Sequence, residues 1–401
     1  MSREGYKVFS ESRLAGLTLK NRLVRSATHE ASMTEDGKVT DAILKLYCEL
    51  ALGGVGMIIT GHMAVAPQGK ASPLQTCIWD DSYIKEIAAI ADAVHRCENG
   101  CKILAQISHG GRQVFHENSI AECVGPSPVP CPILKKKPRE LSAQEIQDIA
   151  DRFVKAIVRV KKAGFDGVQL HAAHGYLLSS FLSPYTNRRN DQYGGPPANR
   201  VAIIREIVSG ARKEVGDFPI LAKINGEDSV PGGIDINNFP ALAAEIEKAG
   251  IDAIEVSGGI WDCLARSEKE LGFLPVPIPE SRTRINSPEK QSYFLKYAEK
   301  LELNIPVILV GGNRNIELLE KIINQGAVDF FSLARPLISE PGLPDRWLRG
   351  IGGEKADCVS CSSCLLIASS GETISCMLKQ NRLKQKITKN LTPYLWRMFF
   401  K

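Results

Sequence analysis

Two histidines and a tyrosine stand close together in one segment of the chain. His171, His174 and Tyr176 directly follow a short apolar run that ends at Leu170. Two neutral imidazoles can donate hydrogen bonds to one carbonyl oxygen and stabilise negative charge that develops on it. A phenol, whose pKa is ordinarily about 10, can deliver a proton at neutral pH without being ionised. These three residues are therefore candidates for a catalytic site that polarises a carbonyl group.

Spacing alone leaves two other interpretations of these histidines open. A pair of histidines beside a carboxylate can bind a metal, and Asp166 lies upstream of His171, just before the predicted strand. The imidazoles can also have a purely structural role, in which they bond to carbonyl groups of the loop.

Four cysteines form a second cluster near the C-terminal end of the sequence. Cys358, Cys361 and Cys364 follow a Cys-x2-Cys-x2-Cys pattern, and Cys376 comes after eleven further residues. In a cytosolic chain such a cluster indicates metal binding before disulfides. The spacing favours a four-iron, four-sulfur (4Fe-4S) cluster. A four-thiolate zinc site and uncoordinated thiols remain the alternatives.

Short apolar runs alternate with amphipathic stretches along the chain, as expected of βα units around a parallel sheet. Eight strands are predicted at residues 23–27, 56–60, 103–107, 167–170, 220–224, 253–256, 307–310 and 330–333. Helices are predicted at 41–52, 81–97, 143–163, 199–215, 239–249, 290–301 and 316–325. Eight strands close a (β/α)8 TIM barrel, in which catalytic groups leave the C-terminal ends of the strands, as His171 does.

Several boundaries carry signals of their own. Ser142 and Glu145 form a capping-box pattern that predicts the start of a helix. Gly164 and Gly250 suit the left-handed residue that ends a helix before a strand. We expect residues 118–139 and 261–287 to be loops that shape the mouth of the barrel. The predicted organisation is a barrel at 1–350, a cysteine segment at 351–378 and a basic tail at 379–401.

A phosphate site is predicted from the last two strands. The segment VGGNR at 310–314 follows the seventh strand, and Ala334 and Arg335 follow the eighth. Loops after these two strands of a TIM barrel often bind phosphate. Gly311 and Gly312 allow close approach of the backbone, and Arg335 can bind two phosphate oxygens. A pair of tight turns is the alternative.

Charge and hydropathy restrict the class of protein. The net charge is +5, but residues 379–401 contain seven basic residues and no acidic one, so the remainder carries about −2. The sequence has no nucleic-acid motif, no run of about 20 apolar residues and no secretory signal. We therefore expect a cytoplasmic protein that neither binds nucleic acid nor spans a membrane. The basic, aromatic tail is expected to pack on its own barrel or on a second subunit, and docking to an acidic redox partner or an anionic membrane is the alternative.

Several motifs in a characteristic order give the chain a family resemblance. They are LTLKNRLV at 17–24, GVGMIIT at 54–60, LAQISHGGR at 104–112, the histidine segment from Gly164, RNDQYGG at 189–195, LAKING at 221–226 and LARPLI at 333–338. From about Phe9 to about Arg349 the chain resembles the old yellow enzyme family of FMN-dependent oxidoreductases. The resemblance implies an enzyme that takes electrons from NAD(P)H and reduces an activated C=C bond of an enone or an enoyl-CoA.

The resemblance also implies roles for matching positions around the flavin. Ala27 and Thr28 would contact the flavin ring, and Gln106 would bond its pyrimidine edge. Lys223 would offset negative charge near N1 and O2 of the reduced ring. His62 occupies a position that is small in better-known members.

On the substrate side, the resemblance places the substrate oxygen on His171 and His174, with Tyr176 protonating the carbon opposite the hydride. Arg189 would be structural. Ser26, Thr28 and His29 depart from the pattern of many relatives, as His62 does, so we expect a more polar pocket, which weighs against the usual preference for enones.

The cysteine segment resembles the 2,4-dienoyl-CoA reductase and trimethylamine dehydrogenase branch of the family. There a 4Fe-4S cluster relays electrons to the flavin, but Ser360 and Ser362 stand where the branch usually has Gly and Asn. We expect no second flavin and no separate nucleotide-binding domain in this chain. Two alternatives remain: an amine-type dehydrogenase, with Trp79 or Trp261 facing the cation, and an electron-transfer subunit. Lys135, Lys136 and Lys137 are weak candidates for CoA phosphates.

Overall fold

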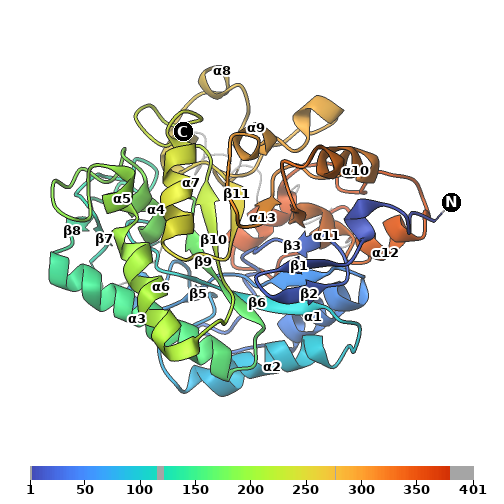
Figure 1. Cartoon of the computed structure of the whole chain (residues 1–401), viewed down its shortest axis with the longest axis horizontal. Coiled ribbons are helices and arrows are strands. Elements are labelled where there is room, and N and C mark those ends of the chain that lie inside the picture. Colours follow the sequence, from blue (N-terminus) through green and yellow to red (C-terminus); the bar gives the residue numbers. More distant parts are fainter. Residues whose placement is uncertain (1, 115–121, 276, 380–401) are drawn as a thin grey trace.

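Eight parallel strands close into a barrel in the computed structural model, which describes residues 2–114, 122–275 and 277–379 (Figure 1). In order they are β3 (Leu23–Arg25), β4 (Met57–Ile59), β6 (Lys102–Ser108), β9 (Gly167–Ala172), β10 (Ile220–Asn225), β11 (Ala253–Ser257), β12 (Val307–Leu309) and β13 (Phe330–Leu333). Each strand pairs in parallel with the next, and β13 pairs with β3 to complete the circle. All eight predicted strands and the (β/α)8 fold are confirmed.

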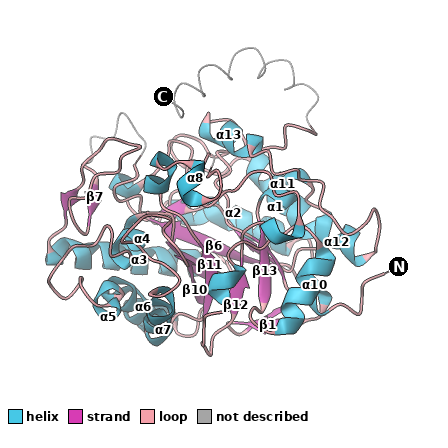
Figure 2. Ribbon diagram, turned by 90° about the horizontal axis from the view of Figure 1, so that it is seen from above, coloured by secondary structure: helices cyan, strands magenta, loops and turns pink. Residues whose placement is uncertain are grey.

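Helices surround the barrel and follow most strands, as Figure 2 shows. They are α1 (Asp41–Leu52), α2 (Tyr83–His95), α3 (Ala143–Lys162), α5 (Pro197–Arg200), α6 (Ala202–Val215), α7 (Phe239–Lys248), α9 (Leu295–Ala298), α10 (Ile316–Gln325), α11 (Arg335–Ser339) and α12 (Leu343–Leu348). Shorter elements decorate the ends of the barrel: α4 (Leu177–Leu182), α8 (Glu268–Leu271), α13 (Ser363–Ser369) and the strands β1 (Ser12–Leu14), β2 (Leu17–Leu19), β5 (Met63–Ala64), β7 (Val124–Gly125) and β8 (Arg139–Glu140).

The helix predicted at 290–301 is wrong over most of its length. Only α9 is helical there, after a single 3-10 turn at Pro288–Lys290. Ser292 has a φ of +47°, which an α-helix cannot contain. This turn directs Tyr293 and Phe294 towards Gly311, where a Cβ atom would lie within 2.7 Å of both rings. Packing of two aromatic rings on a glycine loop therefore overrides the local helical pattern.

The predicted helix ends are confirmed. Ser142 accepts a hydrogen bond from the backbone of Glu145, whose side chain bonds back to the backbone of Ser142. Gly164 and Gly250 have φ values of +82° and +91°.

Alternation along the strands separates the barrel interior into layers. At the N-terminal end the interior is apolar, and the β1–β2 hairpin plugs it with Leu14 and Leu19, which pack against Leu104 and Phe330. Two residues further along most strands the interior becomes polar, as from Leu104 to Gln106 and from Leu221 to Lys223, because side chains with a period of two face the same side of a strand. The strands therefore place polar side chains at the C-terminal mouth of the barrel and apolar side chains at its N-terminal end.

Both predicted mouth loops contribute to the wall of a cavity. Ile133 and Leu134 come from the loop after β6, and Trp261, Ile278 and Glu280 come from the loop after β11. Residues 115–121 of the first loop, residue 276 of the second and the tail at 380–401 lie outside the described residues. The predicted packing of that tail is therefore untested.

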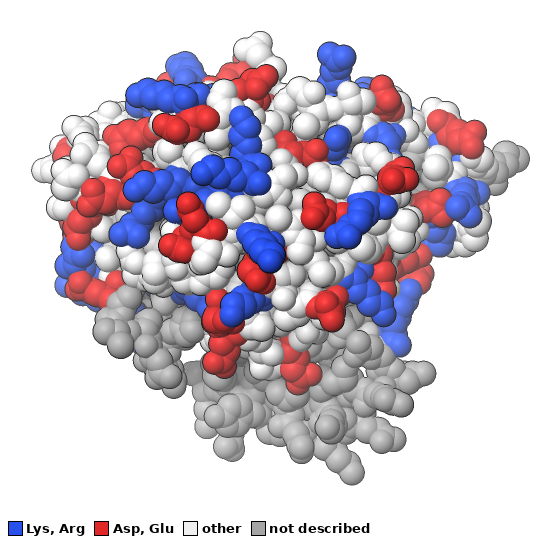
Figure 3. All heavy atoms as spheres, turned by 90° about the horizontal axis from the view of Figure 1, so that it is seen from below, with Lys and Arg blue, Asp and Glu red and all other residues white. Residues whose placement is uncertain are grey.

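Surface charge is mixed on the face shown in Figure 3, where basic and acidic side chains are interspersed. Among the described helices, none is long and apolar enough to cross a bilayer.

The two mouth loops are joined by a buried ion pair. Arg112 follows β6, Asp262 lies in the 3-10 turn Trp261–Ala265 after β11, and their side chains are 1% and 2% exposed. The guanidinium contacts both carboxylate oxygens, with Nη1 3.1 Å from Oδ1. Such a pair fixes geometry because each charge depends on the other for its solvation.

We expect Asp262→Ala to lower the free energy of unfolding by about 3–5 kcal/mol, because it leaves the Arg112 charge buried and unpaired. Denaturant unfolding of the purified protein measures this loss. The matched control is the double variant Arg112→Met with Asp262→Leu, which removes both charges and should lose much less. A single variant within about 1 kcal/mol of the unaltered protein would contradict this role of the pair.

Candidate active site

A cavity of about 770 Å³ opens at the C-terminal mouth of the barrel. This volume lies in the range of cofactor and substrate sites. All twelve residues predicted for catalysis or flavin binding line it: Ala27, Thr28, His62, Gln106, His171, His174, Tyr176, Lys223, Gly311, Gly312, Ala334 and Arg335. They come from seven of the eight strands or the segments just after them, so only closure of the barrel brings them together.

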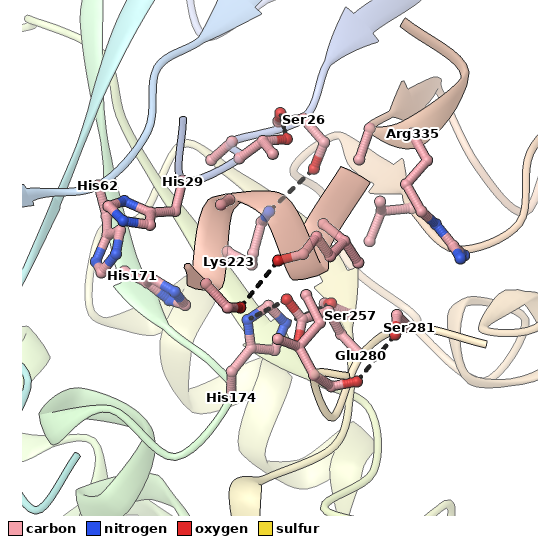
Figure 4. Close-up of a pocket in the computed structure, with 18 of the residues that line it drawn as sticks. Ser26, His29, His62, His171, His174, Lys223, Ser257, Glu280, Ser281 and Arg335 are labelled. Carbon is pink, nitrogen blue, oxygen red and sulfur yellow. Dashed lines mark hydrogen bonds and ion pairs between the residues drawn. The ribbon is translucent and has the colours of Figure 1, made fainter. Parts of the chain in front are cut away.

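Imidazole rings and one phenol are packed edge to face in this cavity. The ring centroid of His171 lies 5.1 Å from that of His174 and 4.7 Å from that of Tyr176. His62 extends the cluster, 5.6 Å from His171, and His29 lies a further 5.6 Å away. In Figure 4, His29, His62 and His171 lie on one side of the cavity and Arg335 on the opposite side. The cavity thus has a wall of imidazoles and, across from it, a cationic end.

Hydrogen bonds fix which ring nitrogen of His171 and of His174 is free. The backbone N–H of Ala173 lies 3.4 Å from Nδ1 of His171, which makes Nδ1 the acceptor and leaves the proton on Nε2. In His174, Nε2 lies 2.8 Å from the hydroxyl of Ser257, and the backbone N–H donates to Asn225 at 3.1 Å. His174 is also held at a φ of +61°. Each ring therefore has one anchored nitrogen and one available for a ligand.

Burial keeps these rings uncharged. It lowers the pKa of His29 to about 4. Burial, with a smaller contribution from the charge of Lys223, lowers the pKa of His62 to about 3. The same two influences bring the pKa values of His171 and His174 well below the usual value of an imidazole. Neutral imidazoles donate hydrogen bonds without adding a charge, as the predicted carbonyl-polarising role requires.

Tyr176 remains protonated throughout the physiological range. Burial, with a smaller contribution from Glu280, raises its pKa above the ordinary value. A buried phenol next to neutral imidazoles keeps its proton until a stronger base forms beside it. The arrangement suits a proton donor that acts only when charge develops on the substrate.

A polar layer below the imidazoles forms the floor of the cavity. Gln106 donates to Gln169 at 2.7 Å, and Gln169 donates to Glu255 at 2.8 Å. Lys223 Nζ lies 3.4 Å from Glu255 and 3.0 Å from the hydroxyl of Ser26, which also bonds Glu255. Gln106 and Lys223 were predicted as single contacts, whereas the structure joins them through two residues that the prediction omitted. Their signal was available, since Gln169 and Glu255 are polar interruptions of apolar strands.

The opposite end carries the features predicted for a phosphate. Gly311 and Gly312 have φ values of +107° and +81°, and a Cβ at either would meet Phe294 or Tyr293 at less than 3 Å. Arg335 lines the same end. Sequence reasoning missed Arg314 and Ser332, although Arg314 lies in the predicted glycine segment. Both residues line the cavity, and Arg314 Nη1 and Ser332 Oγ are buried without a hydrogen-bond partner among the described residues.

Buried unpaired donors are costly, and an anion or ligand that accepts from them is one explanation for such donors. The glycine turn, two arginines and the orphaned donors of Arg314 and Ser332 therefore fit a phosphate group. In a protein loaded with FMN, these donors would hold the phosphate group of the cofactor.

The metal interpretation of His171 and His174 is wrong. Asp166 points to the other end of the barrel, where it lies 2.9 Å from His95 and 3.1 Å from Lys102. Across the residues that the structure describes, no three His, Cys, Asp or Glu side chains are placed to hold one metal ion. Of the two tryptophans considered for an amine substrate, Trp261 lines the cavity, whereas Trp79 stacks on Tyr83 outside it. Arg189 is structural, because it binds Asp191 and the carbonyl of Leu141.

The four clustered cysteines line one small cavity next to the main one. Cys358, Cys361, Cys364 and Cys376 all face it, and Arg335 lies between the two cavities and lines both. Each cysteine is a free thiol, and burial raises the pKa of Cys364 to about 12. The sulfurs share a cavity but are not placed around a single ion, which a zinc site with Zn–S bonds of about 2.3 Å would require.

The two serines beside Cys361 have an unusual backbone. Ser360 and Ser362 each have a φ of +61°, the left-handed region that glycine and asparagine adopt most easily. Their hydroxyls accept hydrogen bonds from Arg314 at 3.0 Å and Arg335 at 2.7 Å. This departure from the family pattern therefore keeps the turn and adds two contacts to the arginines of the main cavity.

A family model described as the NADH:flavin oxidoreductase / NADH oxidase family matches residues 7–353. The chain belongs to this family. The resemblance to old yellow enzymes, based on the order of the motifs, is thereby confirmed.

Individual relatives agree with the family. The chain is 38% identical to an NADH oxidase of Thermoanaerobacter brockii, over 88% of this chain and 52% of the relative. It is 33% identical to an NADPH dehydrogenase of Bacillus licheniformis, over 84% of this chain and 93% of the relative. The solved complex of 2-naphthoyl-CoA reductase with 2-naphthoyl-CoA superposes with a TM-score of 0.83 at 25% identity, over 93% of this chain and 56% of that one. The chain therefore spans about half the length of some relatives and nearly all of others.

The neutral state of the imidazole wall is testable directly. We expect the ¹⁵N resonances of His29, His62, His171 and His174 to stay at neutral-imidazole positions between pH 5.5 and 8, because burial lowers the pKa of each ring. Long-range ¹H–¹⁵N spectra of histidine-labelled protein measure this, with single His→Gln variants for assignment. Protonation of any of the four within this range would contradict the electrostatic description of the cavity.

Proposed function

We propose that the chain binds FMN in the main cavity and uses NAD(P)H to reduce an activated C=C bond of an enone or enoyl-CoA. The observation that carries this proposal is the meeting of all twelve predicted residues in one cavity, with a neutral imidazole wall at one end and phosphate-binding donors at the other. The membership in a family of NADH:flavin oxidoreductases supports it.

The residues would divide the work as follows. When bound, FMN supplies the hydride that it has taken from NAD(P)H. His171 and His174 hold the substrate carbonyl through their available nitrogens and stabilise the negative charge that develops on its oxygen. Tyr176, 4.7 Å from the His171 ring, delivers the proton to the neighbouring carbon. Ala27 and Thr28, which line the same cavity, would support the flavin ring from the end of β3.

Lys223 would set the electrostatics of the flavin floor. The residue is 3% exposed, and its ammonium group is held by Ser26 and Glu255. A fixed positive charge beneath the ring favours extra electron density on the ring. Gln106 lies in the same layer, with its amide oriented by Gln169. This layer would therefore stabilise the reduced form of the cofactor.

The phosphate group would bind at the opposite end. Gly311 and Gly312 permit backbone contact there, and Arg314, Ser332 and Arg335 supply donors. An acyl-CoA substrate is supported by the likeness to 2-naphthoyl-CoA reductase. Lys136 is less available for a CoA phosphate than the sequence suggested, because its ammonium donates to the carbonyl of Val114 at 3.2 Å.

We further propose that the cysteine cavity holds a 4Fe-4S cluster. The four cysteines Cys358, Cys361, Cys364 and Cys376 line the same small cavity, and such clusters are held by four cysteine thiolates. Arg314 lies 3.7 Å from the sulfur of Cys358 and provides a compensating charge. A cluster in this position would exchange electrons with the flavin past Arg335, with NAD(P)H or a redox partner protein at the other end of the transfer. Association into a homo-oligomer stays a separate proposal.

We expect Tyr176→Phe to slow reduction of 2-cyclohexen-1-one by about 10²–10⁴-fold, because it removes the proton donor. Reduction of the flavin by NAD(P)H should change by less than about threefold, since that step needs no phenol. Stopped-flow absorbance separates the two half-reactions. Tyr83→Phe, on the outer helix α2, is the matched control. Unchanged enone turnover in Tyr176→Phe would remove the proposed acid.

A further inference from the structure

A carboxyl group faces the two catalytic histidines from the loop after β11. Glu280 lines the main cavity, and 28% of its side chain remains accessible there. Figure 4 places Glu280 beside His174 and Ser257. Its backbone is fixed, because the hydroxyl of Tyr293 donates to the carbonyl of Glu280 at 2.9 Å. The proposed reduction of the C=C bond assigns no role to Glu280.

The distance between Glu280 and His174 is suited to a third atom. Oε1 of Glu280 lies 3.7 Å from Nδ1 of His174, which is too long for a direct hydrogen bond. Because Nε2 of His174 is held by Ser257, Nδ1 is the available nitrogen. The two atoms are separated by less than two hydrogen-bond lengths. One oxygen atom can therefore lie about 2.8 Å from both Nδ1 of His174 and Oε1 of Glu280. A substrate oxygen placed there by His174 is therefore also within reach of Glu280.

The charges around Glu280 come from several elements. Lys223 on β10 and Arg335 on α11 lower its pKa, but burial is the larger influence and raises the pKa to about 7. Tyr176 and the thiol of Cys263 also face it, and both are protonated at neutral pH because burial raises their pKa values. His174 is neutral. Both the acid and the carboxylate form of Glu280 are consequently accessible near pH 7.

We propose that Glu280 is a third hydrogen-bond partner of the substrate oxygen, which donates to that oxygen as a carboxylic acid and repels it as a carboxylate. This inference rests on the proposed function. The acid keeps its proton in the reaction, so the proton delivered to carbon still comes from Tyr176. Ionisation of Glu280 replaces a donor with a negative charge next to an oxygen that is itself becoming negative. Reduction of carbonyl-activated substrates should therefore weaken as the pH rises.

The test uses the FMN-loaded protein, reduced in the absence of air and mixed with 2-cyclohexen-1-one between pH 6 and 9. In the unaltered protein we expect the rate of flavin reoxidation to fall by at least about tenfold from pH 6 to pH 9. In Glu280→Gln, whose amide is a donor at every pH, the rate should vary by less than about threefold over the same range. Glu289→Gln alters an exposed carboxylate outside the cavity and should behave like the unaltered protein.

A second acceptor separates the effect on the substrate oxygen from a general effect on the flavin. Ferricyanide takes electrons without placing a carbonyl between His174 and Glu280, so its rate should not show the alkaline decline. This measurement needs no variant, and so stays decisive if Glu280→Gln fails to fold. Carboxyl ¹³C spectra add a reading that is independent of turnover: a glutamate signal that titrates near pH 7 should disappear in Glu280→Gln.

The inference is overturned if Glu280→Gln keeps the alkaline decline or if ferricyanide shows the same decline. Glu30 would then be the candidate cause, because burial raises its pKa to about 7 as well and it lies outside the cavity. Failure of the proposed function has a different signature: the enone would not reoxidise the reduced flavin at any pH.

Discussion

An ion pair buried across the middle of the barrel constrains everything above it. Lys223 and Glu255 are 3% and 0% exposed, so both charges have given up their hydration. Such a pair is tolerated only when its remaining donors and acceptors are bonded. Ser26 and Gln169 meet this demand, and Gln106 orients Gln169 in turn. Side chains from five strands or their ends are thereby joined in one hydrogen-bonded layer.

The floor determines the electrostatics of the cavity. The wall above it is made of imidazoles that burial keeps neutral, so Lys223 stands near no histidine charge that could compete with it. At the far end, Arg314 and Arg335 add positive charge and also hold the serines of the cysteine turn. A cavity that presents the ammonium group of Lys223, neutral donors and a protonated phenol stabilises negative charge that develops on a bound group. That is the physical requirement of hydride transfer to a polarised C=C bond.

Much of this arrangement could be predicted from the sequence, for identifiable reasons. Strand positions follow from apolar runs, and the position of His171 at the end of a strand follows from the fold. The links between residues could not be predicted, because Gln169, Glu255 and Glu280 act through neighbours that only barrel closure supplies. The segment at 290–301 was misjudged since its helical pattern says nothing of Gly311, against which Phe294 packs. Arg314 was overlooked although it ends the glycine motif, and its orphaned nitrogen is visible only in three dimensions.

The most direct test of the account is the visible absorption spectrum of protein purified without air, recorded before and after addition of NADH or NADPH. We predict flavin bands that bleach when the nucleotide is added. We also predict a broad iron–sulfur absorbance that requires Cys358, Cys361, Cys364 and Cys376. Protein that carries no flavin, and does not acquire it when FMN is supplied, would contradict the central claim that this cavity is a flavin site.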